Sequence, residues 1–181
     1  MEGGTHSMAH AMTFRRLRKE SEQLAASTDE FIQLSCRSDD NLLDWVASMR
    51  GPPDSYYDGY VFDVEIKVPP EYPVVPPSMR FLTKIFHPNV LFSTGEVCID
   101  ILKKDWTPAW SLQSACRAIL SIMGDPNADS PLNCDAGNVL RAGDTEAYAG
   151  LVSLYCGQFA VRVPQALLDK DNDVSSAGPK A

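Results

Sequence analysis

The sequence predicts a single α+β domain, in which one helix precedes a four-stranded antiparallel meander sheet and three helices follow it. Apolar residues recur at helical spacing near the N-terminus, alternate with polar residues through the next stretch, and return to helical spacing after residue 111. This order gathers the helices at the two ends of the domain and on one face of the sheet. A chain of 181 residues is long enough for one such core with tails.

The first helix is predicted over residues 12–26, where Phe14, Leu17, Ser21 and Leu24 fall on one face. Its other face is basic and carries Arg15, Arg16, Arg18 and Lys19. A solvated surface is the simplest explanation of this cluster. Residues 1–11 are predicted to form a flexible leader and residues 164–181 a mobile, acidic and polar tail, which leaves 12–163 as the folded domain.

Three segments alternate between apolar and polar residues, as half-buried antiparallel strands do. Their inward-facing residues are Ile32, Leu34 and Cys36, then Trp45, Ala47 and Met49, then Tyr60, Phe62, Val64, Ile66 and Val68. In the third segment Asp63, Glu65 and Lys67 face the other way, and Asp58-Gly59 provides a turn before it. These segments predict the first three strands of the sheet.

A proline-rich run from Pro69 to Pro77 follows the third strand. Proline lacks a backbone donor and fixes φ, so this run cannot be a helix or a central strand. It predicts a rigid crossover to a fourth strand, whose apolar face is supplied by Met79 and Phe81.

Three helices are predicted after the strands. Ser111 is a predicted N-cap for a helix with an apolar face made of Leu112, Ala115, Cys116, Ile119, Leu120 and Met123. Asp129-Ser130-Pro131 predicts the next N-cap, with proline at the first helical position and a helix that runs to about Arg141. Asp144 can cap the last helix, where one side is formed by Tyr148, Leu151, Tyr155 and Phe159.

Composition excludes several classes of function. The 16 basic and 24 acidic residues give a net charge of -8, which argues against a general nucleic-acid binder. No apolar run is long enough for direct membrane insertion. Five cysteines without a Cys-x-x-Cys pair, together with only three histidines, predict neither a disulfide framework nor a metal site and favour a reducing, cytoplasmic compartment. No glycine-rich phosphate loop is present, so no resident cofactor is expected.

The stretch from Lys84 to Trp110 holds the residues best suited to chemistry. His87-Pro88-Asn89 precedes the turn-forming Ser93-Thr94-Gly95, and Cys98 follows directly after that loop. A thiol and an amide donor suit acyl transfer, in which sulfur attacks a carbonyl and the amide steadies the oxyanion. The plain alternative is that Cys98 is a small core residue.

The same stretch resembles the active-site signature of the ubiquitin-conjugating enzymes. The resemblance lies in His-Pro-Asn, a short polar loop, Gly-Glu-Val-Cys-Ile-Asp-Ile-Leu and Trp-Thr-Pro, and the similarity runs from about Met12 to Phe159. It implies the ubiquitin-conjugating fold. It also implies that Cys98 accepts ubiquitin as a thioester from an activating enzyme and passes it to an acceptor. The implied partners are ubiquitin, the activating enzyme and a RING-type ligase.

The resemblance assigns roles to further residues. Asn89 matches the asparagine that steadies the oxyanion or orders the nearby loop, and His87 matches the residue that braces this turn. The position of the acid that activates the incoming lysine corresponds to Ser130, which departs from the common aspartate, with Asp129 just before it. Either Asp129 substitutes, or Ser130 helps by hydrogen bonding, or a ligase supplies the acid; a simple helix cap is the structural alternative for Ser130.

Two docking surfaces are implied as well. The residues that match ligase-contacting positions are Phe81, Pro108 and Ala109, and the positions on the first helix that match activating-enzyme contacts are Arg15, Arg16 and Lys19. Without the resemblance, Phe81 would simply be a core residue. The docking of exposed aromatic and proline side chains would make a compact anchor.

Within the family, the sequence is most similar to the peroxisomal branch. The loop before Cys98 is one residue longer than in the commonest members, and Trp-Thr-Pro-Ala-Trp and Gly-Asn-Val-Leu-Arg-Ala-Gly-Asp also fit that branch. Its members act at the cytosolic face of the peroxisome on the import receptor, recruited by a membrane-anchored peroxin. The alternatives are conjugation in another pathway or of a ubiquitin-like modifier, and a non-catalytic ubiquitin-binding variant.

Overall fold

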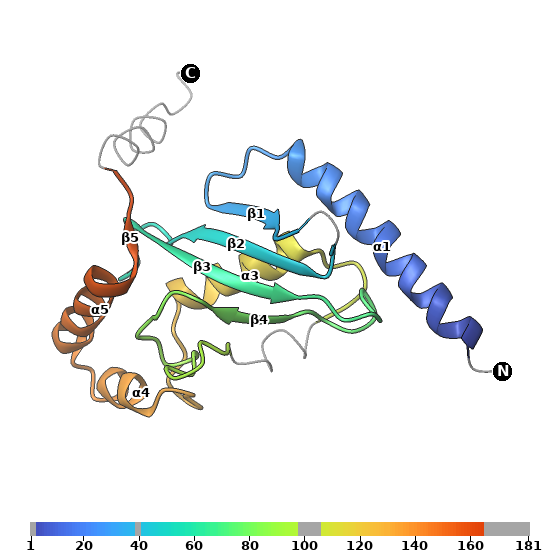
Figure 1. The fold of residues 1–181 in the computed structure, drawn as a ribbon. Coiled ribbons are helices and arrows are strands. Elements are labelled where there is room, and N and C mark those ends of the chain that lie inside the picture. Colours follow the sequence, from blue (N-terminus) through green and yellow to red (C-terminus); the bar gives the residue numbers. More distant parts are fainter. Residues whose placement is uncertain (1–2, 39–40, 98–105, 165–181) are drawn as a thin grey trace, which may run out of the picture.

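A computed structural model describes residues 3–38, 41–97 and 106–164 of the chain. Figure 1 shows a long N-terminal helix, α1 (Gly3–Ala25), beside a twisted antiparallel sheet, with the C-terminal helices at the opposite end. The helix α3 (Leu112–Gly124) lies across one face of the sheet, and α4 (Cys134–Arg141) and α5 (Thr145–Phe159) follow it. The predicted α+β class and the order of its elements are confirmed.

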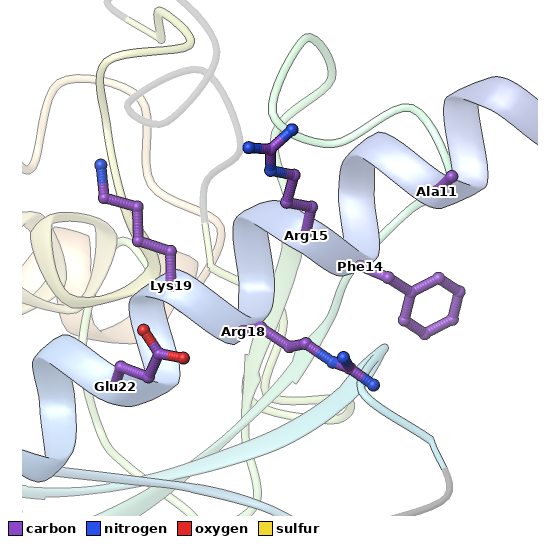
Figure 2. Close-up of a pocket in the computed structure, with 6 residues that line it drawn as sticks. All are labelled: Ala11, Phe14, Arg15, Arg18, Lys19 and Glu22. Atoms are coloured by element: carbon purple, nitrogen blue, oxygen red, sulfur yellow. The ribbon is translucent and has the colours of Figure 1, made fainter.

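The helix α1 differs from its prediction in where it begins and in what it buries. It begins at Gly3 rather than Met12, because the intervening residues include no proline and several good helix formers. Its inward face is formed by Thr13, Leu17 and Glu20, whereas Ser21 is exposed. Figure 2 shows the outward face of this helix.

Buried polar residues share the inward face of α1 with Leu17, because each of them has a partner. Thr13 donates to the carbonyls of Pro70 and Tyr72, both at 2.7 Å. Glu20 is 3% exposed and accepts hydrogen bonds from Arg16 Nε, the Tyr72 hydroxyl and Leu112 N at 2.6, 2.6 and 2.9 Å. A buried carboxylate is tolerated when it is paired in this way. Glu20 thereby ties α1 to the proline-rich crossover and to the first residue of α3.

The sheet is a meander in the order β1-β2-β3-β4, as predicted. The strands are β1 (Ile32–Cys36), β2 (Asp44–Arg50), β3 (Tyr60–Lys67) and β4 (Ser78–Phe81). Register pairs Ala47 with Val64, and Val64 with Phe81, which stacks the apolar residues of neighbouring strands on one face. A short strand, β5 (Val161–Arg162), pairs with the start of β3 and was not predicted, since two residues give no periodicity.

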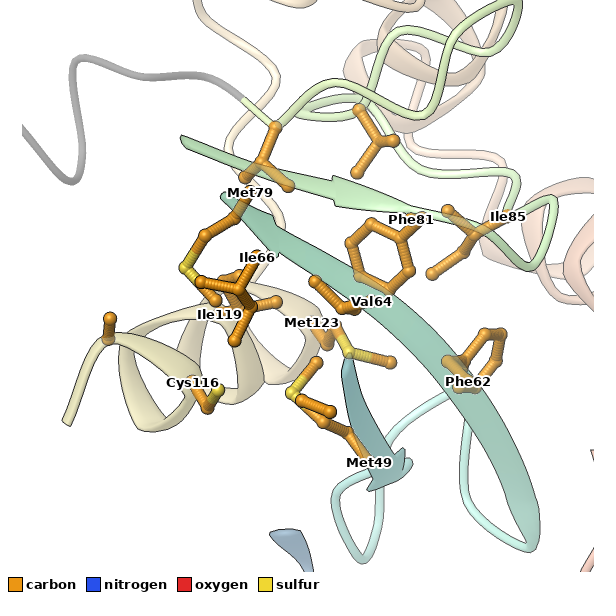
Figure 3. Close-up of a cluster of buried hydrophobic side chains, with 14 of the residues drawn as sticks. Met49, Phe62, Val64, Ile66, Met79, Phe81, Ile85, Cys116, Ile119 and Met123 are labelled. Carbon is orange, nitrogen blue, oxygen red and sulfur yellow. The ribbon is translucent and has the colours of Figure 1, made fainter. Parts of the chain in front are cut away.

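The main core lies between this sheet face and α3. Figure 3 shows Cys116, Ile119 and Met123 of α3 pointing at the apolar side chains of β2, β3 and β4. Ser111 caps α3 as predicted, and its capping box is completed by Ser114. Cys116 is fully buried, and burial raises the pKa of its thiol, so it is a structural residue.

The outward face of the sheet is charged, with one departure from expectation. Glu65 faces outward as predicted but is 6% exposed. Arg80, Arg37 and Lys67 surround it, and the hydrogen bond from Arg80 is the main reason that its pKa lies below the usual range. A carboxylate can be this enclosed because these three cations pair with it.

The helix α4 begins later than its prediction. Its N-cap is Asn133, whose side chain accepts from Ala136 N at 3.2 Å, so the predicted cap at Asp129-Ser130-Pro131 is wrong. The reason is tertiary: the backbone N–H groups of Leu132 and Asn133 both donate to the Pro88 carbonyl, at 2.8 and 3.0 Å. The backbone of Leu132 and Asn133 therefore binds the His87-Pro88-Asn89 segment before the helix starts.

The helix α5 is capped by Asp144 as predicted, but its buried face is shifted. Tyr148, Val152 and Cys156 are buried, whereas the predicted Phe159 is 38% exposed. The buried Tyr148 hydroxyl lies 3.0 Å from that of Tyr57, which donates in turn to the Phe86 carbonyl at 2.7 Å. These hydrogen bonds fix the rotation of α5.

Candidate active site

The segment His87-Pro88-Asn89 is held by three separate parts of the fold. His87 Nε2 lies 3.1 Å from the carbonyl of Ile122 in α3, and the Pro88 carbonyl accepts from the chain that enters α4. The Asn89 side chain reaches the loop between α3 and α4. Three consecutive residues thus join three segments, which fixes the position of this backbone.

His87 is neutral and structural in this arrangement. Its Nδ1 accepts from Asn89 N at 3.0 Å, so Nε2 carries the proton and donates to Ile122 O. The residue is fully buried, and desolvation lowers its pKa to about 4. An imidazole with both nitrogens engaged and no access to solvent is unsuited to proton transfer, in agreement with the bracing role expected for it.

Asn89 is engaged in a reciprocal pair with the backbone of Asn127. Its Nδ2 donates to Asn127 O at 2.8 Å, and its Oδ1 accepts from Asn127 N at 2.9 Å. Asn89 is itself only 3% exposed. Of the two roles expected from the resemblance, loop ordering is the one for which this geometry supplies contacts.

The turn after Asn89 brings the chain back toward β4. Gly95 N donates to Leu91 O and Leu91 N to Glu96 O, both at 2.8 Å, which closes the predicted turn around Ser93-Thr94-Gly95. Gly95 has φ +79, and a Cβ placed on it would lie 2.0 Å from Phe81 O, so glycine is required there for two reasons. The segment ends at the buried Val97, beside Val90. Cys98 itself lies outside the described residues.

The segment from Trp106 to Trp110 is held by the proline-rich crossover and by α1. Trp106 Nε1 donates to Pro73 O at 2.9 Å. Arg16 donates to the carbonyls of Pro108 and Trp110, at 2.9 and 2.7 Å, besides its bond to Glu20. The guanidinium of Arg16 is therefore occupied by structural contacts within the domain.

Asp129 and Ser130 are both exposed and lie on the loop that Asn89 holds. Asp129 N donates to Asn127 Oδ1 at 2.8 Å, which makes a local turn of the kind asparagine favours. Asn127 thus links the backbone of Asp129 to the residue that Asn89 holds. Sequence reasoning missed Asn127, although its position four residues before Pro131 in a loop rich in turn-forming residues was a signal.

The expected ligase-contacting set is only partly exposed. Pro108 and Ala109 are exposed, but Phe81 is 3% exposed and packs edge-on against Phe62, so the expectation of an exposed aromatic there is wrong. Phe81 lies on the inward face of β4, and the register of the sheet leaves no other direction for its side chain. Val74 is an exposed apolar residue on the crossover: it is 73% exposed and follows Pro73, whose carbonyl accepts from Trp106.

Three of the basic residues of α1 are exposed to solvent, whereas Arg16 is half-buried. Arg15, Arg18 and Lys19, with Phe14 and Glu22, line a shallow hollow of about 540 Å³. Figure 2 shows that these side chains point to different sides of the helix and do not converge on one point. The hollow suits a broad, protein-sized contact better than a small ligand. Arg18 was not among the predicted contact residues, and Arg16 faces the domain instead.

Within residues 3–38, 41–97 and 106–164, no group of three or more histidine, cysteine, aspartate or glutamate side chains is arranged to hold a metal ion. No helix in the described part of the chain combines the length and apolar character needed to cross a membrane.

The sequence also matches a known family along most of its length. Residues 16–156 match the ubiquitin-conjugating enzyme family. The chain is a member of that family. It is accordingly a transferase of the ubiquitin-conjugation pathway, with the fold that the resemblance implied.

The conjugating enzyme is similar to peroxin-type members of the family. Protein PEROXIN-4 of Arabidopsis thaliana is 48% identical over 147 residues, which cover 81% of this chain and 92% of that protein. Ubiquitin-conjugating enzyme E2 pex4 of Dictyostelium discoideum is 47% identical over 140 residues, covering 77% and 94%. The crystal structure of H. polymorpha Pex4p in complex with the soluble domain of Pex22p has a TM-score of 0.75 at 34% identity, and the match covers 82% of this chain and 98% of that chain.

Proposed function

We propose that this conjugating enzyme accepts ubiquitin as a thioester on Cys98 and transfers it to a protein acceptor. The observation that carries the proposal is the anchoring of His87-Pro88-Asn89. Hydrogen bonds to three other segments of the fold hold these residues, which precede Cys98 in the chain. Cys98 sits where the family signature has its nucleophile. A fixed backbone on the approach to a nucleophile is what positioning catalysis requires.

The proposed reaction has two acyl-transfer steps. In the first, the Cys98 thiolate attacks the carbonyl carbon of the ubiquitin thioester on the activating enzyme, a C–S bond forms, and the activating enzyme's thiolate leaves. In the second, the acceptor attacks the same carbon and the Cys98 thiolate leaves. When the acceptor is an amine, its proton passes to a nearby base, for which the exposed Asp129 is the carboxylate on the adjoining loop. Ser130 lies beside it as a hydrogen-bonding group.

We assign two docking surfaces to the proposed enzyme. Val74, Pro108 and Ala109 are the exposed residues proposed to contact a RING-type ligase, with Val74 in place of the buried Phe81. The exposed Arg15 and Lys19 of α1 are proposed to contact the activating enzyme, whereas Arg16 ties this helix to the Pro108–Trp110 segment. The catalytic domain assigned to residues 12–163 contains both surfaces.

We further propose that the enzyme belongs to the peroxisomal pathway. The identity of nearly half with PEROXIN-4 and pex4 proteins, over most of both chains, supports this assignment. The H. polymorpha relative was solved in complex with the soluble domain of Pex22p, and a membrane-anchored peroxin of that kind is the partner proposed here. It would recruit the enzyme from the cytoplasm to the cytosolic face of the peroxisomal membrane, with the import receptor as acceptor.

A charging assay tests the central proposal. The protein is incubated with ubiquitin, activating enzyme and ATP, and a reductant-sensitive adduct one ubiquitin heavier is expected. Cys98→Ala should abolish this adduct, and Cys98→Ser should give a reductant-resistant oxyester, since oxygen is the poorer leaving group. Cys134→Ser is the matched control, because Cys134 is an exposed free cysteine on α4. No adduct with ubiquitin, but one with a ubiquitin-like protein, would move the enzyme to another modifier; no adduct at all would favour a non-catalytic binding variant.

The peroxisomal assignment needs a separate test. Purified enzyme charged on Cys98 is mixed with the import receptor, its ligase and the soluble domain of the peroxin, and receptor modification is followed on gels. The peroxin domain is expected to bind the enzyme and increase receptor modification. Normal charging without binding to that domain would leave the conjugating activity intact and place the enzyme in another pathway.

A further inference from the structure

The loop between α3 and α4 has a second anchor besides Asn89. Asn89 holds Asn127 from inside the domain, whereas Arg141, in the last turn of α4, reaches the neighbouring residue from outside. Arg141 Nη1 donates to Ala128 O at 2.9 Å. The two anchors therefore act on adjacent peptide groups, directly before the exposed Asp129 and Ser130.

Arg141 is itself held in the orientation that this contact needs. Its Nη2 donates to Asn138 Oδ1 at 2.6 Å, one turn earlier on α4. The planar guanidinium has a rigid fork of donors, so fixing one nitrogen on the helix aims the other at the loop. A lysine at this position could bond to one of the two oxygens but not to both with this geometry.

The contact has a consequence for the residues that follow it. Asp129 N is bound to Asn127 Oδ1, so Asp129 moves with the Asn127–Ala128 unit. With Arg141 removed, Asn89 would hold only one end of that unit, and the exposed Asp129 and Ser130 would sample more positions. Exposed loops carry this freedom unless a hydrogen bond removes it.

We propose that Arg141 is a positioning residue for ubiquitin transfer: it fixes the Asn127–Ser130 loop so that Asp129 and Ser130 meet the acceptor amine in one arrangement. The inference rests on the proposed function, because it assigns the loop to the acceptor side of the Cys98 thioester. It concerns the second acyl transfer alone. Charging by the activating enzyme does not use an acceptor amine and is expected to be unaffected.

The test measures the two transfers separately in the full chain. Enzyme charged with ubiquitin is separated from ATP, and single-turnover loss of the thioester is followed over a range of free-lysine concentrations. Arg141→Ala is expected to lower the saturating rate by about three- to ten-fold, as loss of one positioning hydrogen bond does, with little change in the lysine concentration at half-saturation. Arg141→Lys should restore part of the rate, and Asn138→Ala should lower it by less than Arg141→Ala.

Arg117→Ala provides the matched control. Arg117 is an exposed arginine on α3 that bonds to Asp29, away from the loop, so its loss should leave both transfers unchanged. A double-mutant cycle adds a readout that general damage would not give. Because Asn89 and Arg141 hold one loop, Asn89→Ala and Arg141→Ala together should slow discharge by less than the product of their single effects.

The outcomes separate the two proposals. Normal charging with wild-type discharge in Arg141→Ala overturns the positioning role and leaves the proposed function standing. Equal losses in charging and discharge also overturn it, because they indicate damage to the whole domain. A wild-type protein that never forms the Cys98 adduct overturns the proposed function, and this inference falls with it.

Discussion

The neutral, buried His87 makes the stability of this enzyme depend on pH in a defined window. Its pKa in the folded protein is about 4, below the ordinary value of 6.5. Between these values the unfolded chain binds a proton that the folded chain does not, so stability rises with pH across this interval. The contribution is complete above about pH 6.5 and is lost progressively as the pH falls toward 4.

The magnitude follows from those two values. At pH 5.5 the imidazole is mostly charged in the unfolded chain and mostly neutral in the folded one, and the linkage relation gives a loss of about 1.4 kcal/mol relative to pH 7.5. Carboxylates contribute little in this range, because most of them titrate below it. His87 is thus expected to dominate the change in stability between these two pH values.

Urea unfolding at pH 7.5 and 5.5 measures this change. Wild type should lose about 1.4 kcal/mol of stability between these two pH values. His87→Gln should not show this loss, because the glutamine amide can supply a donor and an acceptor but does not titrate. His10→Gln, on the exposed side of α1, should keep the wild-type difference. An identical pH difference in wild type and His87→Gln would refute the assignment of a neutral, solvent-excluded imidazole.

Three further pairs of substitutions test the packing around the site and the proposed ligase-contacting surface. Glu20→Ala should lower the free energy of unfolding by about 3 kcal/mol, because Arg16, Tyr72 and Leu112 lose their shared acceptor. In the control Glu22→Ala, at an exposed position, the free energy of unfolding should change by less than about 0.5 kcal/mol. Urea titration measures both changes. Gly95→Ala should lower the melting temperature more than Gly143→Ala, since both have positive φ but only at Gly95 would the new Cβ meet a backbone oxygen, and equal shifts in calorimetry would contradict this. Phe81→Ala should cost about 3–5 kcal/mol of stability, because its side chain is buried. Val74→Arg should leave the melting temperature unchanged and weaken ligase binding in a titration. Weaker ligase binding in Phe81→Ala without loss of stability would instead place Phe81 on the docking surface.

Patterns that depend on neighbouring residues could be predicted from sequence. Alternation placed the inward faces of β2 and β3, and the local capping chemistry of Ser111 and Asp144 placed the starts of α3 and α5. The turn at Gly95 was also predictable from local sequence, because its positive φ favours glycine. The residue types of His87, Asn89 and Cys98 suit acyl transfer, and the resemblance of the surrounding motif to the ubiquitin-conjugating enzymes made that reaction the prediction.

Contacts between distant segments could not be predicted in the same way. Helical periodicity did not single out Glu20 and Thr13, because their partners on the crossover and at the start of α3 lie far away in sequence. The cap predicted at Ser130 moved to Asn133 because the Pro88 carbonyl, far away in sequence, captures the backbone N–H groups in between. For Phe81, alternation predicted the apolar face of the fourth strand and the resemblance predicted a docking residue, and the register of β4 against β3 decides for the inward position.

The sequence by itself therefore determined the class of fold, because that follows from periodicity and local backbone chemistry, and its resemblance to the conjugating-enzyme family pointed to the type of reaction and to Cys98 as the expected nucleophile. Tertiary structure alone decided how the site is braced. It occupied Asn89 with Asn127, left His87 neutral and inaccessible, and brought Arg141 onto the acceptor-side loop. The physical reason is that a hydrogen bond, or the pKa shift of a buried group, depends on which groups lie together in space. Local sequence patterns do not reveal such contacts between residues that are far apart in the chain.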